Sequence, residues 1–209
     1  MSAVVKKISD GAHSLGLSFS DDVYIALEKY LELLVKWNNS FNLSGISNPL
    51  DMVSRHILDS LAVSPYLQGD MIADIGTGAG LPGIPLAIAN PDKKFILVDS
   101  NGKKTRFLFQ AKLNLNLHNI SIENCRIEHY QSKEQIDIVL SRAFASLSDM
   151  AEKTQHLLAP NGFMLALKGR FPEQEIEELD DRFTVTKTEK LIIPGEEGER
   201  HLVFLEQLY

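Results

Sequence analysis

The chain has 209 residues, of which 44% are hydrophobic and 23% charged, and its formal net charge is −7 at pH 7. This composition excludes a disordered or low-complexity chain, and the negative charge argues against a nonspecific nucleic-acid coat protein. Its apolar runs are far shorter than the ~20 residues that cross a bilayer, so we expect no membrane partner.

The N-terminal third is predicted to be helical. Apolar residues recur there at three- and four-residue steps, the spacing of one helix face, in a stripe of Val23, Leu27, Tyr30, Leu34 and Trp37. Ser20 is the expected N-cap of this helix. A second helix is expected from Pro49, in its first turn, to about Ala62. We expect residues 1–65 to form a helical extension packed on a domain of residues 66–209, in one compact unit.

From residue 71 onward, short apolar runs alternate with helical segments. The runs are typical of parallel strands covered on both faces; they are Met71–Ile75, Phe95–Val98, Ile120–Ile122, Ile136–Leu140 and Phe163–Leu167. Helices are expected between them, at about Ile84–Ala89, Lys103–Asn114 and Leu147–Leu158. This alternation predicts a doubly wound α/β sheet. Leu202–Leu208 is the expected last strand, with an antiparallel partner around Leu191–Ile193.

The first strand runs into a glycine-rich segment, GTGAGLPG at residues 76–83. Glycines let a chain turn tightly and let backbone N–H groups approach a ligand. Counted from Gly78, the segment matches the dinucleotide fingerprint G-x-G-x-x-G. Counted from Asp74, the pattern Asp-x-Gly-x-Gly-x-Gly resembles the first motif of class I S-adenosylmethionine-dependent methyltransferases. A glycine turn without a ligand is the third interpretation.

Three features favour the methyltransferase interpretation. Asp74 stands at the strand end, where a dehydrogenase normally has an apolar residue, and Gly76 rather than Gly78 follows the strand directly. Pro82 restricts the turn that would begin a pyrophosphate-binding helix, whereas S-adenosylmethionine has no pyrophosphate. We therefore expect Gly76, Gly78 and Gly80 to contact this cofactor.

Asp99 ends the second strand, at the edge where ligands of open α/β sheets bind. Its carboxylate could accept hydrogen bonds from both ribose hydroxyls of the adenosyl group. It could instead cap the helix that follows Asn101 and Gly102. The sequence leaves both roles open.

The sequence also narrows the methyl acceptor. Methylation of an exocyclic amine usually needs an Asn/Asp-Pro-Pro-Tyr loop after the fourth strand, where this chain has Ser141-Arg142-Ala143-Phe144. Methylation of pyrimidine carbon 5 needs a cysteine nucleophile. The single cysteine, Cys125, is more typical of a small buried side chain. The remaining kind of methyl acceptor is an atom with an available lone pair, such as guanine N7. Such a lone pair needs alignment with the methyl group and no general base. We therefore assign Arg142 a positioning role, single out no residue as catalytic, and predict no metal site.

Five motifs occur in order and together resemble one family. They are Arg55-His56-x-x-Asp59-Ser60, the segment from Asp74 to Gly83, Ser141-Arg142-Ala143-Phe144, Lys168-Gly169 and Gly198-Glu-Arg200-His201. The chain resembles the bacterial small-subunit ribosomal RNA guanine-N7 methyltransferase G family, also called glucose-inhibited division protein B. The resemblance covers residues 20–208, and no motif position departs from it.

The resemblance implies a Rossmann-like class I fold with a mostly parallel sheet and an N-terminal helical cap. It also implies methyl transfer from S-adenosylmethionine to N7 of one guanine in 16S rRNA, in the decoding-region hairpin of the 30S subunit. The cofactor contacts that it implies are Gly76, Leu81, Ile127, Glu128 and Arg142. Candidates for RNA contact are Arg55, His56, Arg126, Lys168, Arg200 and His201. Glu128 could instead be a surface acid, His56 a structural histidine, and the basic residues solvated charges.

Charge is unevenly distributed along the chain. Residues 101–170 carry 10 Lys and Arg against 6 Asp and Glu, whereas residues 171–209 carry 4 against 11. The helix with Lys103, Lys104, Arg106 and Lys112 could bind phosphates or could be an exposed helix face.

Nothing in the sequence demands more than a monomer, and the absence of a secretory signal or disulfide pair favours a cytoplasmic protein. A nicotinamide-dependent oxidoreductase and a noncatalytic RNA-binding assembly factor stay open as alternatives.

Overall fold

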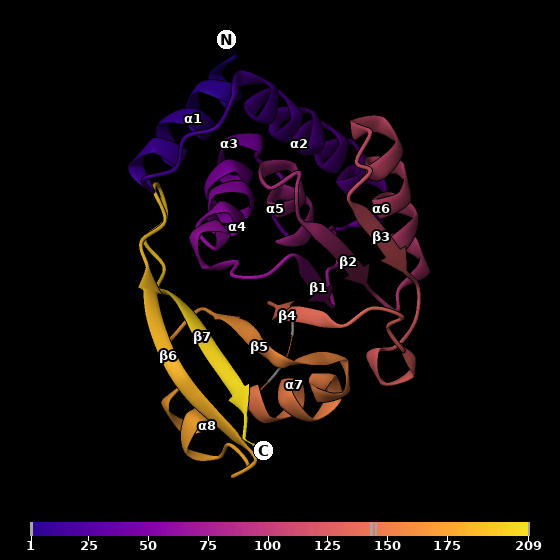
Figure 1. The fold of residues 1–209 in the computed structure, drawn as a ribbon. Helices are drawn as coiled ribbons and strands as arrows, with labels where there is room; N and C mark the ends of the chain where they lie inside the picture. Colours follow the sequence, from indigo (N-terminus) through magenta and orange to yellow (C-terminus); the bar gives the residue numbers. More distant parts are fainter. Residues whose placement is uncertain (1, 143, 145, 209) are drawn as a thin grey trace.

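The computed structural model describes residues 2–142, 144 and 146–208. In this part of the chain seven strands form one sheet in the order β3-β2-β1-β4-β5-β7-β6 (Figure 1). The strands are β1 Met71–Ile75, β2 Lys94–Val98, β3 Ile120–Glu123, β4 Ile136–Ser141, β5 Leu158–Lys168, β6 Phe183–Leu191 and β7 Arg200–Gln207. Strands β1 to β5 are parallel, and β7 is antiparallel to both β5 and β6. The predicted α/β fold with a mostly parallel sheet is confirmed.

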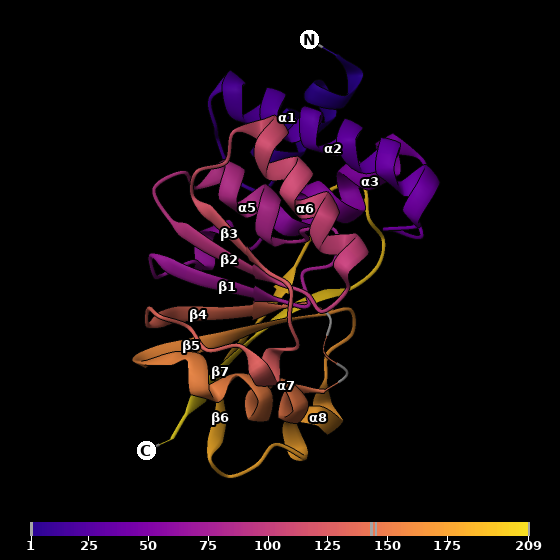
Figure 2. The same cartoon turned by 90° about the vertical axis from the view of Figure 1, so that its right-hand side faces the viewer.

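Helices cover both faces of this sheet (Figure 2). The N-terminal helices lie with α5 and α6 on one side, and α7 and α8 lie on the other. The helices are α1 Ala3–Ser14, α2 Asp21–Phe41, α3 Pro49–Met52, α4 Asp59–Leu61, α5 Gly83–Ala89, α6 Gly102–Leu115, α7 Leu147–Thr154 and α8 Glu173–Glu177. Short 3-10 turns follow at Ser64–Tyr66, Ile127–His129 and Gln155–Leu157. Among the described residues, no helix is long and apolar enough to cross a membrane.

The N-terminal helices share one hydrophobic core with the sheet. Leu27 of α2, Ile57 and the strand residues Ile72 and Leu97 are all fully buried in the same cluster. Tyr30 of α2 reaches the glycine-rich segment and donates a hydrogen bond from its hydroxyl to the carbonyl oxygen of Ala79 at 2.7 Å. Burial raises the pKa of Tyr30 above its ordinary value, so the hydroxyl remains a donor at neutral pH. The helical extension therefore helps to hold the glycine-rich segment.

The helix predicted from Pro49 to Ala62 contains a π-helical turn. Helix α3 continues into this turn at Val53–Leu58, and α4 follows directly. Asn48 caps the start, because its side chain accepts a hydrogen bond from the N–H of Leu50 at 2.9 Å. Such turns often occur at functional sites, and this one carries Arg55 and His56.

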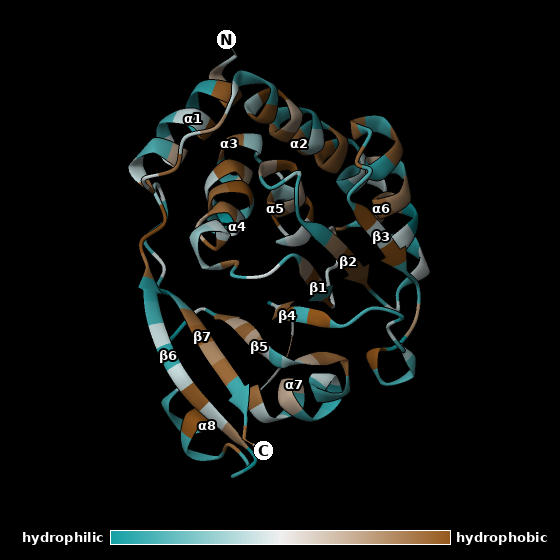
Figure 3. Ribbon diagram, in the orientation of Figure 1, coloured by the Kyte–Doolittle hydropathy of each residue, from teal (hydrophilic) through white to brown (hydrophobic). Residues whose placement is uncertain are grey.

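The C-terminal hairpin differs from its prediction mainly in β6, whereas β7 spans Arg200–Gln207 instead of Leu202–Leu208. The partner expected around Leu191–Ile193 is β6, which ends at Leu191, so Ile192 and Ile193 lie beyond it. Strand β6 is mostly polar, and Figure 3 shows it mostly teal to white beside the browner β7. Its edge position explains this, because one side of the strand faces solvent. The helix predicted to reach Leu158 ends at Thr154, since Leu158 already belongs to β5.

Candidate functional site

The glycine-rich segment after β1 has the backbone conformation that glycine favours. Gly76, Gly78 and Gly80 have φ of +67°, +62° and +85°. A Cβ atom at Gly80 would lie 2.5 Å from the Cδ1 atom of Ile84, whereas one at Gly78 would have the Nζ atom of Lys104 as its nearest neighbour at 3.8 Å. Gly80 is therefore required for packing, and Gly78 faces open space.

Asp74 fixes the shape of this segment from inside the protein. It is fully buried, and its Oδ2 atom accepts hydrogen bonds from the Thr77 hydroxyl at 2.6 Å and the Gly83 N–H at 2.8 Å. Burial raises the pKa of Asp74 to about 7, although both hydrogen bonds and the charge of Arg142 oppose this shift. Among the described residues, none forms a hydrogen bond with the buried Oδ1 atom of Asp74. Asp74 thus ties the start of α5 to the end of β1.

Asp99 holds the glycine-rich segment from the neighbouring strand. Its Oδ2 atom accepts a hydrogen bond from the Gly78 N–H at 2.9 Å, and its Oδ1 atom accepts one from the Asn101 N–H at 2.8 Å. The N-cap of α6 is Asn101, whose side chain accepts from the Lys103 N–H at 2.9 Å. The capping role considered for Asp99 therefore belongs to Asn101. Each carboxylate oxygen of Asp99 retains a second lone pair that a ribose hydroxyl can use.

A hollow of about 520 Å³ lies at the carboxyl ends of β1 to β4, and we name it the cofactor pocket. Four predicted cofactor residues line it: Gly76, Asp99, Ile127 and Glu128. The other lining residues are Ile75, Val98, Ser100, Asn101, Lys104, Cys125, Arg126, Phe144 and Lys153. Apolar side chains can cover an adenine ring and Asp99 can accept from a ribose, so the pocket fits an adenosyl group. Leu81, another predicted contact, is 4% exposed and packs in the core.

A second hollow of about 480 Å³, the basic pocket, lies beside the ends of β4 and β5 and the start of β7. It brings together five residues predicted for positioning or RNA contact: Arg55, His56, Arg142, Lys168 and Arg200. It is also lined by Ile46, Asp59, Leu167, Gly169 and Glu196. Arg142 and Phe144 both follow β4 but line different pockets. Ala143, between them in the predicted motif, lies outside the described residues.

Carboxylates form ion pairs with the cations of the basic pocket. Asp59 pairs with Arg142 at 3.1 Å and with Arg200 at 2.7 Å. Glu196 pairs with Arg55, and Glu175 with Lys168, each at 2.7 Å. These pairs hold long basic side chains in defined positions at the pocket wall.

His56 anchors the loop that leads into α3. Its Nε2 and Nδ1 atoms lie 2.7 Å from the Ser44 hydroxyl oxygen and 2.9 Å from the Arg55 carbonyl oxygen. A carbonyl only accepts, so Nδ1 donates to Arg55 and Nε2 accepts from Ser44. Burial, the largest influence, lowers the pKa of His56 below its ordinary value of 6.5, so the ring is neutral at pH 7.

Two further RNA candidates lie outside the basic pocket. Arg126 lines the cofactor pocket instead. His201 is 7% exposed, and its ring meets Phe171 edge-on at a centroid distance of 5.7 Å. Arg126 therefore lies in the other pocket, whereas His201 is buried next to the basic pocket, beside Arg200 in the chain and opposite Lys168 in the sheet, without lining it.

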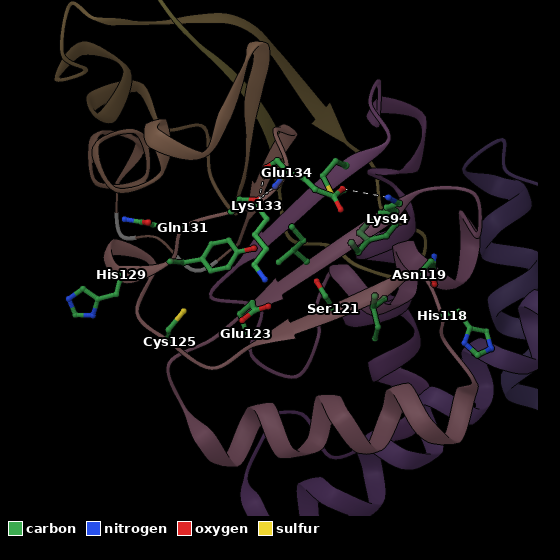
Figure 4. Close-up of a pocket in the computed structure, with 16 residues that line it drawn as sticks. Lys94, His118, Asn119, Ser121, Glu123, Cys125, His129, Gln131, Lys133 and Glu134 are labelled. Carbon is green, nitrogen blue, oxygen red and sulfur yellow. Dashed lines mark hydrogen bonds and ion pairs between the residues drawn. The ribbon is translucent and has the colours of Figure 1, made fainter.

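A larger hollow of about 690 Å³ lies over the β3 edge of the sheet. Figure 4 shows Ser121 and Glu123 of β3 there, with Lys133 projecting over them. It includes Lys94, the first residue of β2, so it extends toward the amino ends of the strands, away from the edge where ligands of such sheets bind. It meets the cofactor pocket at Cys125. Burial raises the pKa of this thiol, and the nearby Glu123 adds to the effect.

Three site residues were not predicted in the roles that the structure gives them. Lys104, which was predicted only as a phosphate contact, lines the cofactor pocket together with Lys153. Asp59 joins two arginines of the basic pocket. One feature of the sequence could have indicated the place of Lys104, namely its position in the first turn of the helix that follows Asp99. Asp59 had only its place in a motif. Within the described part of the chain, no group of three or more His, Cys, Asp and Glu residues could hold a metal ion.

The sequence profile of the family described as rRNA small subunit methyltransferase G matches residues 24–203. The chain belongs to this family. A ribosomal RNA small subunit methyltransferase G from Alteromonas mediterranea is 50% identical, and the match covers 94% of this chain and 93% of the relative. One from Salmonella arizonae is 48% identical, with 97% and 98% covered. The resemblance stated from the motifs is confirmed, and the interpretation of the glycine segment is decided in favour of S-adenosylmethionine.

Solved structures confirm the methyltransferase fold. An S-adenosylmethionine-dependent methyltransferase from Thiobacillus denitrificans, in complex with S-adenosyl-L-homocysteine, aligns with a TM-score of 0.54 at 12% identity over 72% of this chain and 91% of that one. TrmN from Thermus thermophilus aligns with a TM-score of 0.55 at 18% identity over 75% and 53%. Identities this low show a shared fold alone.

Proposed function

We propose that this enzyme transfers a methyl group from S-adenosylmethionine to N7 of one guanine in 16S rRNA, on the 30S subunit or an assembly intermediate of it. The observation that carries the proposal is family membership over residues 24–203. The geometry supports it, because the cofactor pocket and the basic pocket lie at the same edge of the sheet and flank the segment that follows β4.

The cofactor pocket is the proposed site of the methyl donor. Asp99 accepts from the ribose hydroxyls, and Ile127 and Phe144 cover the adenine ring. Gly76 and Gly78 keep side chains away from the donor, and Gly80 lets the segment pack against Ile84. Bound S-adenosylmethionine supplies an electrophilic methyl group on a sulfonium. Arg142 lines the basic pocket, and its charge opposes the raised pKa of Asp74. We propose that Arg142 contacts the acceptor and also the donor.

The basic pocket is the proposed site of the target guanine. Guanine N7 attacks with its own lone pair, so the reaction removes no proton and requires no general base. The side chains therefore have to align the base and exclude water. Arg142 can donate to guanine O6, and Arg55, Lys168 and Arg200 can contact the adjoining phosphates.

Helix α6 is the proposed phosphate contact outside the pockets. It carries Lys103, Lys104, Arg106 and Lys112 and no acidic residue, in a chain whose net charge is −7. Lys104 lines the cofactor pocket, so the helix adjoins the site. We further propose that the enzyme works as a monomer in the cytoplasm, where ribosomal subunits are assembled.

Chemical cleavage of 16S rRNA tests this function in cells. Borohydride and aniline cleave RNA at N7-methylguanosine because the methylated ring is open to reduction. We expect a specific cut in 16S rRNA from cells that carry the gene, no cut when the gene is deleted, and a restored cut when it is returned. An identical cut in deleted cells would contradict the proposal.

A further inference from the structure

Asp59 is a buried carboxylate held between two arginines of the basic pocket. Its side chain is 3% exposed; Oδ2 accepts from the Arg142 Nη1 atom at 3.1 Å, and Oδ1 accepts from the Arg200 Nε atom at 2.7 Å. The three residues come from α4, the end of β4 and the start of β7. One carboxylate therefore joins the helical extension to two strand ends at the proposed guanine site.

These contacts fix two side chains that would otherwise be mobile. The arginine side chains are 32% and 27% exposed, and a long arginine side chain has considerable rotamer freedom. Arg200 is further held by a hydrogen bond from Nη1 to the Glu199 carbonyl oxygen at 2.7 Å. A guanidinium has five N–H donors, so Arg142 and Arg200 can each bind Asp59 and still donate to a ligand.

The charge of Asp59 matters because of the reaction's own charge change. The N7 lone pair forms the new C–N bond while the S–CH₃ bond breaks and its electron pair stays on sulfur. The sulfonium becomes a neutral thioether, the guanine becomes a cation, and no proton leaves. Two guanidinium groups beside the base would oppose this new positive charge. Asp59 reduces their combined charge from +2 to +1.

We propose that Asp59 is a positioning residue for methyl transfer: it aims Arg142 and Arg200 at the target guanine and offsets their charge as the guanine becomes cationic. This inference rests on the proposed function. Asp59 acts through the arginines and touches neither donor nor acceptor.

The first test is Asp59→Asn, which keeps the size of the side chain and removes its charge. We expect kcat for methyl transfer to 30S subunits to fall about tenfold or more, while circular dichroism and S-adenosylhomocysteine binding show a folded protein. Asp59→Glu retains the charge and should recover part of the loss. The matched control is Asp180→Asn, which removes a surface carboxylate that pairs with Arg182 at 2.7 Å. This control variant should keep full activity.

A double-mutant cycle decides whether Asp59 works through Arg142. In an Arg142→Ala background, we expect Asp59→Asn to lower kcat by a smaller factor than it does in the unmodified enzyme, because one of its two partners is already gone. Losses of kcat that simply multiply in the double variant, or a fully active Asp59→Asn, would overturn the inference. The proposed function would still stand in that case if the unmodified enzyme forms 7-methylguanosine. If the unmodified enzyme forms no 7-methylguanosine, the proposed function fails and the inference fails with it.

Discussion

Asp74 is an acid buried where β1 enters the glycine-rich segment. Burial raises its pKa from the ordinary value of 3.8 to about 7. Between these two values the folded protein keeps a proton that the unfolded chain has lost. Folding is therefore favoured less as pH rises through this window, and the contribution is constant above about pH 7.

The variant Asp74→Asn tests this linkage. Asparagine can still accept from Thr77 and Gly83 through its amide oxygen, but it cannot ionise. Relative to the unmodified protein, we expect the variant to gain about 3 kcal/mol in free energy of unfolding between pH 5 and pH 8. Urea denaturation at the two pH values measures this difference. Parallel pH dependence of the two proteins would contradict the raised pKa.

Two glycines of the same segment should respond differently to alanine. At Gly80 a Cβ atom would meet the buried Ile84 at 2.5 Å, whereas at Gly78 it would enter open space near Lys104. Both have positive φ, so each substitution carries a backbone cost of about 1 kcal/mol. We expect Gly80→Ala to lower the melting temperature more, and Gly78→Ala to weaken S-adenosylhomocysteine binding about tenfold. Calorimetry measures both; the reverse ranking would refute the packing argument.

At the scale of elements, α6 presents a basic and partly apolar face to solvent. Lys103 and Arg106 are exposed, and Phe109 and Leu113 are 50% and 74% exposed on the same helix. Cations beside exposed aromatic groups are typical of RNA-binding surfaces, where phosphates and unstacked bases are contacted together.

The double variant Lys103→Ala/Arg106→Ala tests this face. We expect KM for the ribosomal substrate to rise about three- to tenfold, with a shallower salt dependence and unchanged affinity for S-adenosylhomocysteine. The matched control is Lys187→Ala/Lys190→Ala, which removes two exposed cations from β6. This strand forms the edge of the sheet opposite β3 and lies away from α6 (Figure 2). An equal rise in KM for both double variants would assign the effect to net charge rather than to α6.

The five parallel strands could be predicted from the sequence, whereas most of the edge strand β6 could not. Strand β1 begins and ends at the predicted residues, because continuous apolar runs are typical of the sheet centre. Most of β6 was missed, since its threonines and charged residues alternate with few apolar ones. Helix α1 and the π-helical turn within Val53–Leu58 were also missed. The π-helical turn depends on hydrogen bonds five residues apart, which leave no distinct pattern in the sequence.

At the scale of the whole molecule, the helical extension and the sheet share one core, so we expect them to unfold together. Trp37 is the single tryptophan and lies in α2, where its ring packs against Phe107 of α6 at 5.7 Å. Its fluorescence therefore reports on the extension, whereas far-ultraviolet circular dichroism reports on the whole chain. We expect both signals to give one melting temperature. An earlier fluorescence transition would show that residues 1–65 unfold separately.

The two pockets show how far the sequence could predict a site. Gly76 and Asp99 were identifiable because they follow buried strands, and parallel strands end at a common edge. The junction of Asp59 with Arg142 and Arg200 joins residues 83 and 141 positions apart. Such contacts are set by strand order and helix packing, so single motifs could name the residues but not their pairing.

Methyl transfer to isolated 30S subunits tests the central claim most directly. Subunits from cells lacking the gene would be incubated with the enzyme and isotopically labelled S-adenosylmethionine, and the digested 16S rRNA analysed by mass spectrometry. We predict one labelled 7-methylguanosine at a single position. Label on another atom or base would contradict the assignment of guanine N7. The assignment would also be contradicted if S-adenosylhomocysteine binds but no label enters 30S subunits, assembly intermediates or naked 16S rRNA.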